Sequence, residues 1–367
     1  MTKSCGIIGN RYGDGDCEGE WEGYAPEATV LIANGSDYKK RWEWAKSKRA
    51  NVVTMSWHKG SEETSGSLHA RDIYFDYVVV HWPYPSVFAS AGHLGLSGAY
   101  ASGMGYNFFG VANVENDGDG NRCNDVIASS STRKDPTCPH DDREIPEIAA
   151  PGSRHELLGS SFGGTSCATP VAASIAALLM NVSSGLRIWP EAIRAILLAT
   201  ANYQDADGAD WSKYADGADG TGLINARYAQ WTAEKREREP EAQYRAHDYG
   251  TMWASDFDGL YFNKTWKAKA FTTNSRIRVA FTWNSKTTSS DGDPTSSVLD
   301  ADLDLKVYDP DGYLTAWSTT WDSNYEFVEF TPSKVGEYEI KIRGYSVPSN
   351  FWSWYGIAWT AHYDLCT

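Results

Sequence analysis

The pattern of apolar residues changes near residue 230, and this change restricts the folds open to the chain. Before it, short apolar runs alternate with stretches of helical spacing, which is typical of a parallel sheet covered by helices. After it, apolar and polar residues alternate with a period of two, which predicts an antiparallel β-sandwich. We therefore expect an α/β domain over 1–230, a charged linker over 231–250 and a β-sandwich over 251–367.

The same periodicity predicts individual elements. Buried strands are expected in the first domain at 29–33, 51–55 and 86–90. Helices are expected at 38–48, 68–82, 166–181 and 190–201. In the second domain, strands are expected at 276–283, 302–308 and 338–343.

Composition narrows the classes of partner. The formal net charge of −15 repels phosphate backbones and acidic membrane surfaces, so nucleic acid is not an expected partner. A hydrophobic content of 41% is enough to bury a core, which argues against a disordered chain. No apolar run reaches the roughly 18 residues that span a bilayer, and residues 1–5 do not begin a signal peptide.

The segment 163–170, Gly-Gly-Thr-Ser-Cys-Ala-Thr-Pro, is the strongest indication of chemistry. Ser166 follows a glycine pair at the start of an apolar helix, where N–H groups and the helix dipole stabilise a developing oxyanion. The glycines allow a substrate backbone to come close. Any serine at a helix start is also a good N-cap, so a purely structural role for Ser166 stays open at this point.

Residues 164–170 resemble the nucleophile motif Gly-Thr-Ser-x-Ala-x-Pro of the subtilase family of serine peptidases. Further segments resemble subtilase motifs in the family's order: 24–28, 53–56, 91–95, 147–152 and 220–226. The resemblance covers about 1–230, and 251–367 is similar to the jelly-roll domain of one subtilase branch. It implies a three-layer α/β/α domain with a mainly parallel sheet, followed by an antiparallel β-sandwich.

The resemblance also implies an activity: a secreted serine endopeptidase that acts on proteins or peptides through an acyl-enzyme at Ser166. His93 takes the position of the family's oxyanion asparagine, where an imidazole N–H can donate, so we count it with Ser166 as catalytic. The residues expected to line the substrate cleft are Ser56, Trp57, Gly92, Gly164 and Thr165. No organic cofactor is implied.

Two members of the subtilase triad have no counterpart in the sequence. Residues 2–9 align with the family's histidine helix, which puts the histidine one residue before Met1, and the aspartate strand is not matched. The chain is therefore either part of an active peptidase or a degenerate subtilase that binds peptides or serves as a scaffold. His58, His93 and Ser174 favour the second reading. Because losing one triad member costs roughly 10⁴- to 10⁶-fold in turnover, we expect 1–367 to be nearly inert and not to react with a fluorophosphonate.

Two further segments have two readings each. Asp117, Asp119, Asn121 and Asp125 are spaced like the first half of a calcium-binding loop, although the closing glutamate is missing; a solvated turn is the alternative. The aromatic residues of 351–355, with Trp359, form either a sugar-stacking surface or packing between the two domains.

Overall fold

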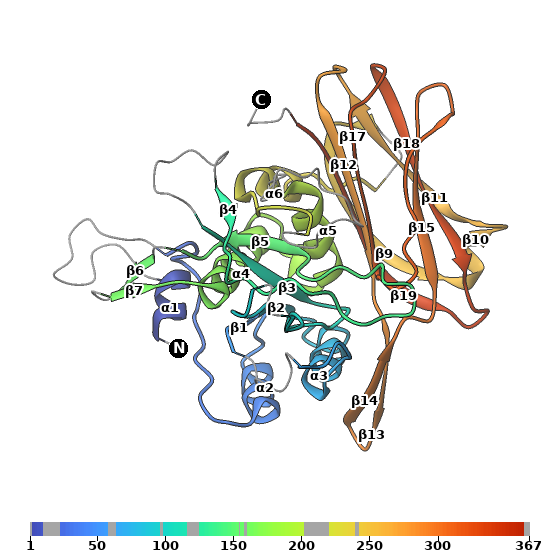
Figure 1. The fold of residues 1–367 in the computed structure, drawn as a ribbon. Coiled ribbons are helices and arrows are strands. Elements are labelled where there is room, and N and C mark those ends of the chain that lie inside the picture. The colour runs from blue at the N-terminus through green and yellow to red at the C-terminus, as the bar shows by residue number, and fades with distance from the viewer. Residues whose placement is uncertain are drawn as a thin grey trace.

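The computed structural model describes residues 2–9, 23–57, 64–95, 98–115, 125–153, 155–157, 160–201, 220–238 and 242–362. They form an α/β unit and a β-sandwich that lie side by side (Figure 1). The predicted fold class is confirmed.

The α/β unit is built on a sheet whose main strands are parallel. These are β1 (Val52–Met55), β2 (Ser86–Ser90), β3 (Phe109–Glu115) and β5 (Ile148–Pro151), in that order, and β4 (Val126–Ile127) pairs antiparallel with β3. All five residues of β2 are buried, as expected of a strand covered on both faces. The expected strands at 51–55 and 86–90 are confirmed.

Helices cover both faces of this sheet. On one face Phe88 packs in the core cluster that includes α4 (Thr165–Val182) and α5 (Pro190–Thr200). Its neighbour Val87 points the other way, into the cluster that includes α2 (Tyr38–Ser47) and α3 (Ala70–Val79). The four predicted helices are therefore confirmed, with ends shifted by a few residues. The remaining helices are α1 (Thr2–Gly9), α6 (Ala226–Ala233) and the short η3 (Ser184–Ile188) and η4 (Ala254–Asp256).

The strand predicted at 29–33 is wrong. These residues form no strand, and Leu31 and Ile32 are 37% and 53% exposed. An extended apolar run becomes a strand only where a neighbour pairs with its backbone. Among the described residues, β1 ends the sheet, so no strand lies beyond it to pair with 29–33.

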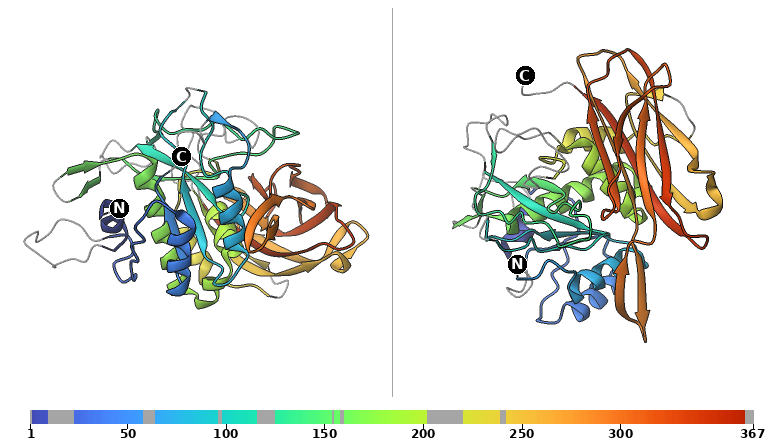
Figure 2. Two further views of the ribbon diagram at one scale, coloured as in Figure 1. Left: turned by 90° about the horizontal axis from the view of Figure 1, so that it is seen from below. Right: turned by 45° about the vertical axis from the view of Figure 1, so that its right-hand side comes forward.

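Two antiparallel sheets make the sandwich (Figures 1 and 2). The outer sheet holds β10 (Phe257–Asp258), β11 (Tyr261–Ala270), β18 (Gly336–Ser346), β15 (Asp302–Tyr308) and β16 (Leu314–Ser318), and β8 (Ala242–Gln243) pairs parallel with β11. The inner sheet holds β17 (Tyr325–Phe330), β12 (Arg276–Trp283), β19 (Trp352–His362) and β9 (Arg245–Trp253). The three strands predicted in this region are confirmed.

The segment 231–250 differs from the expected linker: its start lies in α6, and β8 and the first residues of β9 already belong to the sandwich. Two hairpins complete the elements. The hairpin of β13 (Lys286–Ser290) and β14 (Asp293–Val298) reaches α3, and β6 (His155–Leu157) pairs with β7 (Ser160–Phe162).

The aromatic segment near the C-terminus divides between the core and the surface. Phe351, Tyr355 and Trp359 are buried in the sandwich core. Trp352 stays 48% exposed, and its ring stacks on Trp253 with 5.9 Å between the ring centroids. Three of these rings are therefore structural, because they fill the space between the two sheets.

The interface between the two domains is centred on α5, all of whose residues are buried. The inner sheet lies so close that a Cβ on Gly356 would be 2.3 Å from the Glu191 carbonyl oxygen. Thr282 Oγ1 donates to the same oxygen at 2.9 Å, and Asn284 Nδ2 donates to the Glu191 carboxylate. Burial raises the pKa of Glu191 to about 7. We call this contact the α5 interface.

Among the described helices, α4 is long and apolar enough to cross a membrane, but 72% of it is buried inside the protein. It contacts β1, β2, β3 and β5, which identifies it as the central core helix of the α/β unit.

Candidate active site

Ser166 is the second residue of α4 and is half-buried. Because the helix begins at Thr165, the Ser166 N–H is one of the first-turn donors that have no partner within the helix. The N-cap position belongs to Gly164, whose φ of 95° and ψ of −176° suit glycine almost alone. The alternative reading of Ser166 as the N-cap is therefore wrong, and its hydroxyl has other partners.

Two residues from distant parts of the chain contact that hydroxyl. The Nε2 atom of His93 lies 3.2 Å from Ser166 Oγ, and Ser166 Oγ donates to the carbonyl oxygen of Ser56 at 3.3 Å. Ser56 directly follows β1 and His93 follows β2 by three residues. Both therefore come from the carboxyl ends of neighbouring parallel strands, where sites in open α/β sheets usually form.

The loop that carries His93 is fixed to α4. The Gly92 N–H donates to Thr165 Oγ1 at 3.3 Å, and the same hydroxyl donates to the Gly92 carbonyl oxygen at 3.2 Å. On the other side, the N–H of Leu94 donates to Thr132 Oγ1 at 2.8 Å. These bonds hold the imidazole beside the start of the helix.

Gly164 leaves the space that the imidazole occupies. A Cβ at this position would lie 2.3 Å from His93 Cε1. The Gly164 N–H is bonded to the Gly152 carbonyl oxygen at 2.7 Å, so the backbone cannot easily move away. Gly164 is therefore needed both for its backbone conformation and for the ring beside it.

The structure thus brings Ser166, His93, Ser56, Gly164 and the Gly92–Thr165 pair together. Trp57 has different contacts: its carbonyl oxygen accepts from Arg71 at 2.9 Å, and its ring faces Arg41 and Arg71. Ser174 is fully buried one turn after Pro170, and its hydroxyl donates to the Pro170 carbonyl oxygen at 2.6 Å. It is a core residue.

Several residues expected to bear on function are not described. His58, Asp117, Asp119 and Asn121 lie outside the described residues, while Asp125 is described and half-buried. Within the described part of the chain, no group of three or more His, Cys, Asp and Glu residues could hold a metal ion. The calcium hypothesis stays a prediction.

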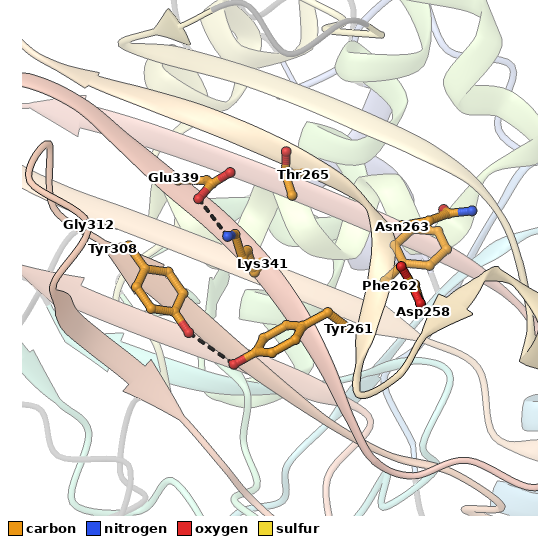
Figure 3. Close-up of a pocket in the computed structure, with 9 residues that line it drawn as sticks. All are labelled: Asp258, Tyr261, Phe262, Asn263, Thr265, Tyr308, Gly312, Glu339 and Lys341. Atoms are coloured by element: carbon orange, nitrogen blue, oxygen red, sulfur yellow. Dashed lines mark hydrogen bonds and ion pairs between the residues drawn. The ribbon is translucent and has the colours of Figure 1, made fainter.

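A shallow pocket of about 430 Å³ lies elsewhere, on the outer sheet of the sandwich (Figure 3). There the hydroxyls of Tyr261 and Tyr308 are 3.0 Å apart, and Lys341 is ion-paired with Glu339 at 2.8 Å. Four of the polar side chains that line it are therefore paired with each other. It is separate from Ser166, which lies in the other domain.

The sequence indicated His93 through its position in the subtilase-like segment 91–95, but as a donor to an oxyanion. It did not predict the direct contact between the imidazole and Ser166. That contact depends on a bond from Thr165, which the sequence predicted only as a cleft-lining residue, and on a bond from Thr132, which carries no recognisable signal.

Comparison with solved structures found partial matches with TM-scores below 0.5. They include the patellamide maturation protease PatA, with 20% identity over 63% of this chain and 82% of that chain and a TM-score of 0.48. The prenylagaramide maturation protease PagA has 18% identity over 62% and 80%, with a TM-score of 0.45. A protease from Pseudoalteromonas arctica has 22% identity over 58% and 65%, with a TM-score of 0.41. The family model for subtilases matches residues 2–223, well over half of the sequence, and the chain therefore belongs to the subtilase family.

Proposed function

We propose that this chain is a serine endopeptidase that cleaves peptide bonds through an acyl-enzyme on Ser166. The observation that supports this most directly is the position of Ser166 Oγ, on the first turn of α4 and within 3.2 Å of an imidazole nitrogen. An N–H group at a helix start is suited to stabilise the oxyanion formed during attack. The substrate would be a polypeptide segment that reaches the carboxyl ends of β1 and β2.

We expect turnover by this chain to be slow. The sequence has no match to the aspartate and histidine motifs of the triad. In a complete triad the aspartate orients the imidazole and stabilises its protonated form, and an isolated histidine has no such support. Family membership further leads us to propose an extracellular location. The spacing of the acidic residues leads us to propose a structural calcium ion bound by Asp117, Asp119, Asn121 and Asp125. The calcium proposal predicts a higher thermal midpoint with calcium than with a chelator, and loss of that difference in Asp119→Asn.

A second function, peptide binding without cleavage, is favoured by one contact. The Ser166 hydroxyl has a single proton, and its bond to the Ser56 carbonyl oxygen at 3.3 Å competes with donation to the imidazole. A serine held in that way is not activated, while the surrounding site can still accept a peptide.

Reaction with an alkyl fluorophosphonate, followed by mass spectrometry of the peptide that contains residue 166, separates the two functions. The sequence alone led us to expect no reaction, but the imidazole beside Ser166 changes that expectation. Peptidase function predicts modification of Ser166 in the unaltered chain and none in Ser166→Ala. No modification at any pH from 5 to 9, together with measurable binding of extended peptides, would establish the second function instead.

A further inference from the structure

We propose that His93 is the general base that activates Ser166, so that the two residues form a serine–histidine dyad. The proposal rests on the peptidase function above and concerns the residue that removes the serine proton. It assigns to His93 a role different from that of an oxyanion donor, which its place in the sequence suggests.

The geometry meets the first requirement for a base. His93 Nε2 and Ser166 Oγ are 3.2 Å apart, at the long end of hydrogen-bond reach, as is common before substrate binds. When the ring hydrogen is on Nδ1, Nε2 has the lone pair that accepts the hydroxyl proton. Ser166 can then turn its proton from the Ser56 carbonyl oxygen, 3.3 Å away, to Nε2 without moving its own oxygen far.

The position of the ring meets the second requirement, because a base must stay in place through the reaction. The Gly92–Thr165 and Leu94–Thr132 bonds hold the loop on both sides of His93. The space left by Gly164 holds the imidazole against the start of α4. His93 is itself exposed, so a proton can leave the ring for solvent.

The described neighbours of His93 and its loop include both uncharged and charged side chains. Those that contact the ring or its loop include the uncharged residues Ser166, Gly164, Thr165 and Thr132. Titratable residues on the described elements beside this loop include Cys167 on α4 and Arg133 and Lys134 next to Thr132, with the Lys134 ammonium directed to the Gly98 carbonyl oxygen.

The chemistry of this step is balanced by the two residues alone. As Ser166 Oγ bonds to the substrate carbonyl carbon, its proton passes to His93 Nε2, and the carbonyl oxygen takes the negative charge. When the carbon–nitrogen bond breaks, the imidazolium returns that proton to the departing amine. With His93 acting as the base, the oxyanion formed during attack is stabilised by the Ser166 N–H, one of the first-turn donors that have no partner within the helix.

The rate of fluorophosphonate reaction at Ser166, measured from pH 5 to pH 9, tests the proposal. Here Ser166 Oγ bonds to phosphorus, fluoride leaves, and the hydroxyl proton passes to His93 and then to solvent. The informative variant is His93→Asn, because an amide N–H can donate to an oxyanion but cannot accept the serine proton. If His93 is the general base, His93→Asn and His93→Ala should both slow the reaction by about 10²- to 10⁴-fold.

The unaltered chain should also show a rate that rises about tenfold per pH unit while the imidazole is protonated and levels off once it has lost its proton, whereas His93→Asn should lose this profile. Free imidazole should partly restore the reaction of His93→Ala, a result that a misfolded variant would not give. If His93→Asn reacts as fast as the unaltered chain, the base role is wrong and the peptidase function stands. If the unaltered chain does not react at any pH, both proposals fail.

Discussion

Glu191 offers a direct test of the α5 interface, because its carboxyl group is 3% exposed between the two domains. Burial raises its pKa from an ordinary value of 4.5 to about 7, against the opposing effects of the Asn284 hydrogen bond and of Arg194. In the folded protein the group therefore holds its proton more tightly than in the unfolded chain. Its contribution to stability is fully present below pH 4.5 and is lost as the pH rises to about 7.

The size of this loss follows from the two pKa values. At 1.36 kcal/mol for each pH unit between them, the ionised carboxylate costs about 3 kcal/mol at pH 8. Glu191→Gln keeps a side-chain oxygen for Asn284 and has no proton to lose. We therefore expect the variant to match the unaltered chain at pH 5 and to be more stable by about 3 kcal/mol at pH 8.

Urea unfolding followed by tryptophan fluorescence at the two pH values measures this difference. Glu337→Gln is the matched control, since that glutamate is 51% exposed and pairs with Lys267 at the surface. Its effect should stay within about 1 kcal/mol at both pH values. If the free energies of unfolding of Glu191→Gln and the unaltered chain differ by the same amount at pH 5 and at pH 8, the buried carboxyl does not make the α5 interface sensitive to pH.

Three further substitutions test the packing around the site and the interface. Gly164→Ala places a methyl group 2.3 Å from His93 Cε1 at a φ of 95°, so we expect a loss of about 1–3 kcal/mol in urea unfolding and almost no reaction at Ser166. Gly356→Ala puts a methyl group 2.3 Å from the Glu191 carbonyl oxygen and should lower the free energy of unfolding by about 1–3 kcal/mol. Thr165→Val removes the hydroxyl that fixes the His93 loop, so it should slow fluorophosphonate reaction more than it lowers the thermal midpoint.

Each of these predictions has an outcome that contradicts it. Gly163→Ala is the control for Gly164→Ala, because its Cβ would meet nothing closer than 3.3 Å. Equal losses of stability and of reaction at Ser166 in the two variants would show that Gly164 has no special role. Thr169→Val is the control for Thr165, since the Thr169 hydroxyl bonds only within α4. If Thr165→Val and Thr169→Val react at the same rate, the His93 loop does not depend on Thr165. An unchanged unfolding curve in Gly356→Ala would mean that the α5 interface can shift to accommodate the added methyl group.

Elements with strong periodicity could be predicted from the sequence. β2 is a short, mainly apolar run whose five residues are all buried. α5 starts with a proline in its first turn. Both elements therefore lie close to their expected bounds. The run 29–33 has the same local signal but no neighbouring strand in the described sheet, and pairing is a property of the tertiary fold.

The contents of the site were only partly predictable for the same reason. A family resemblance marked Ser166 and His93, yet the 3.2 Å contact between them depends on how two loops are tied together. The buried Glu191 could not have been identified from sequence either. It stands on the first turn of a helix, where an acidic residue is usually at the surface, and only the inner sheet of the sandwich covers it.

The position of α5 also bears on how the molecule can be divided. One side of this helix belongs to the core around α4, and the inner sheet of the sandwich covers the other side. Cutting the chain after α6 would expose one side of this buried, largely apolar helix to water, and the detached strands would lose the surface against which they pack. We therefore expect the two domains to be stable only together, with the sandwich as a structural support of the α/β unit.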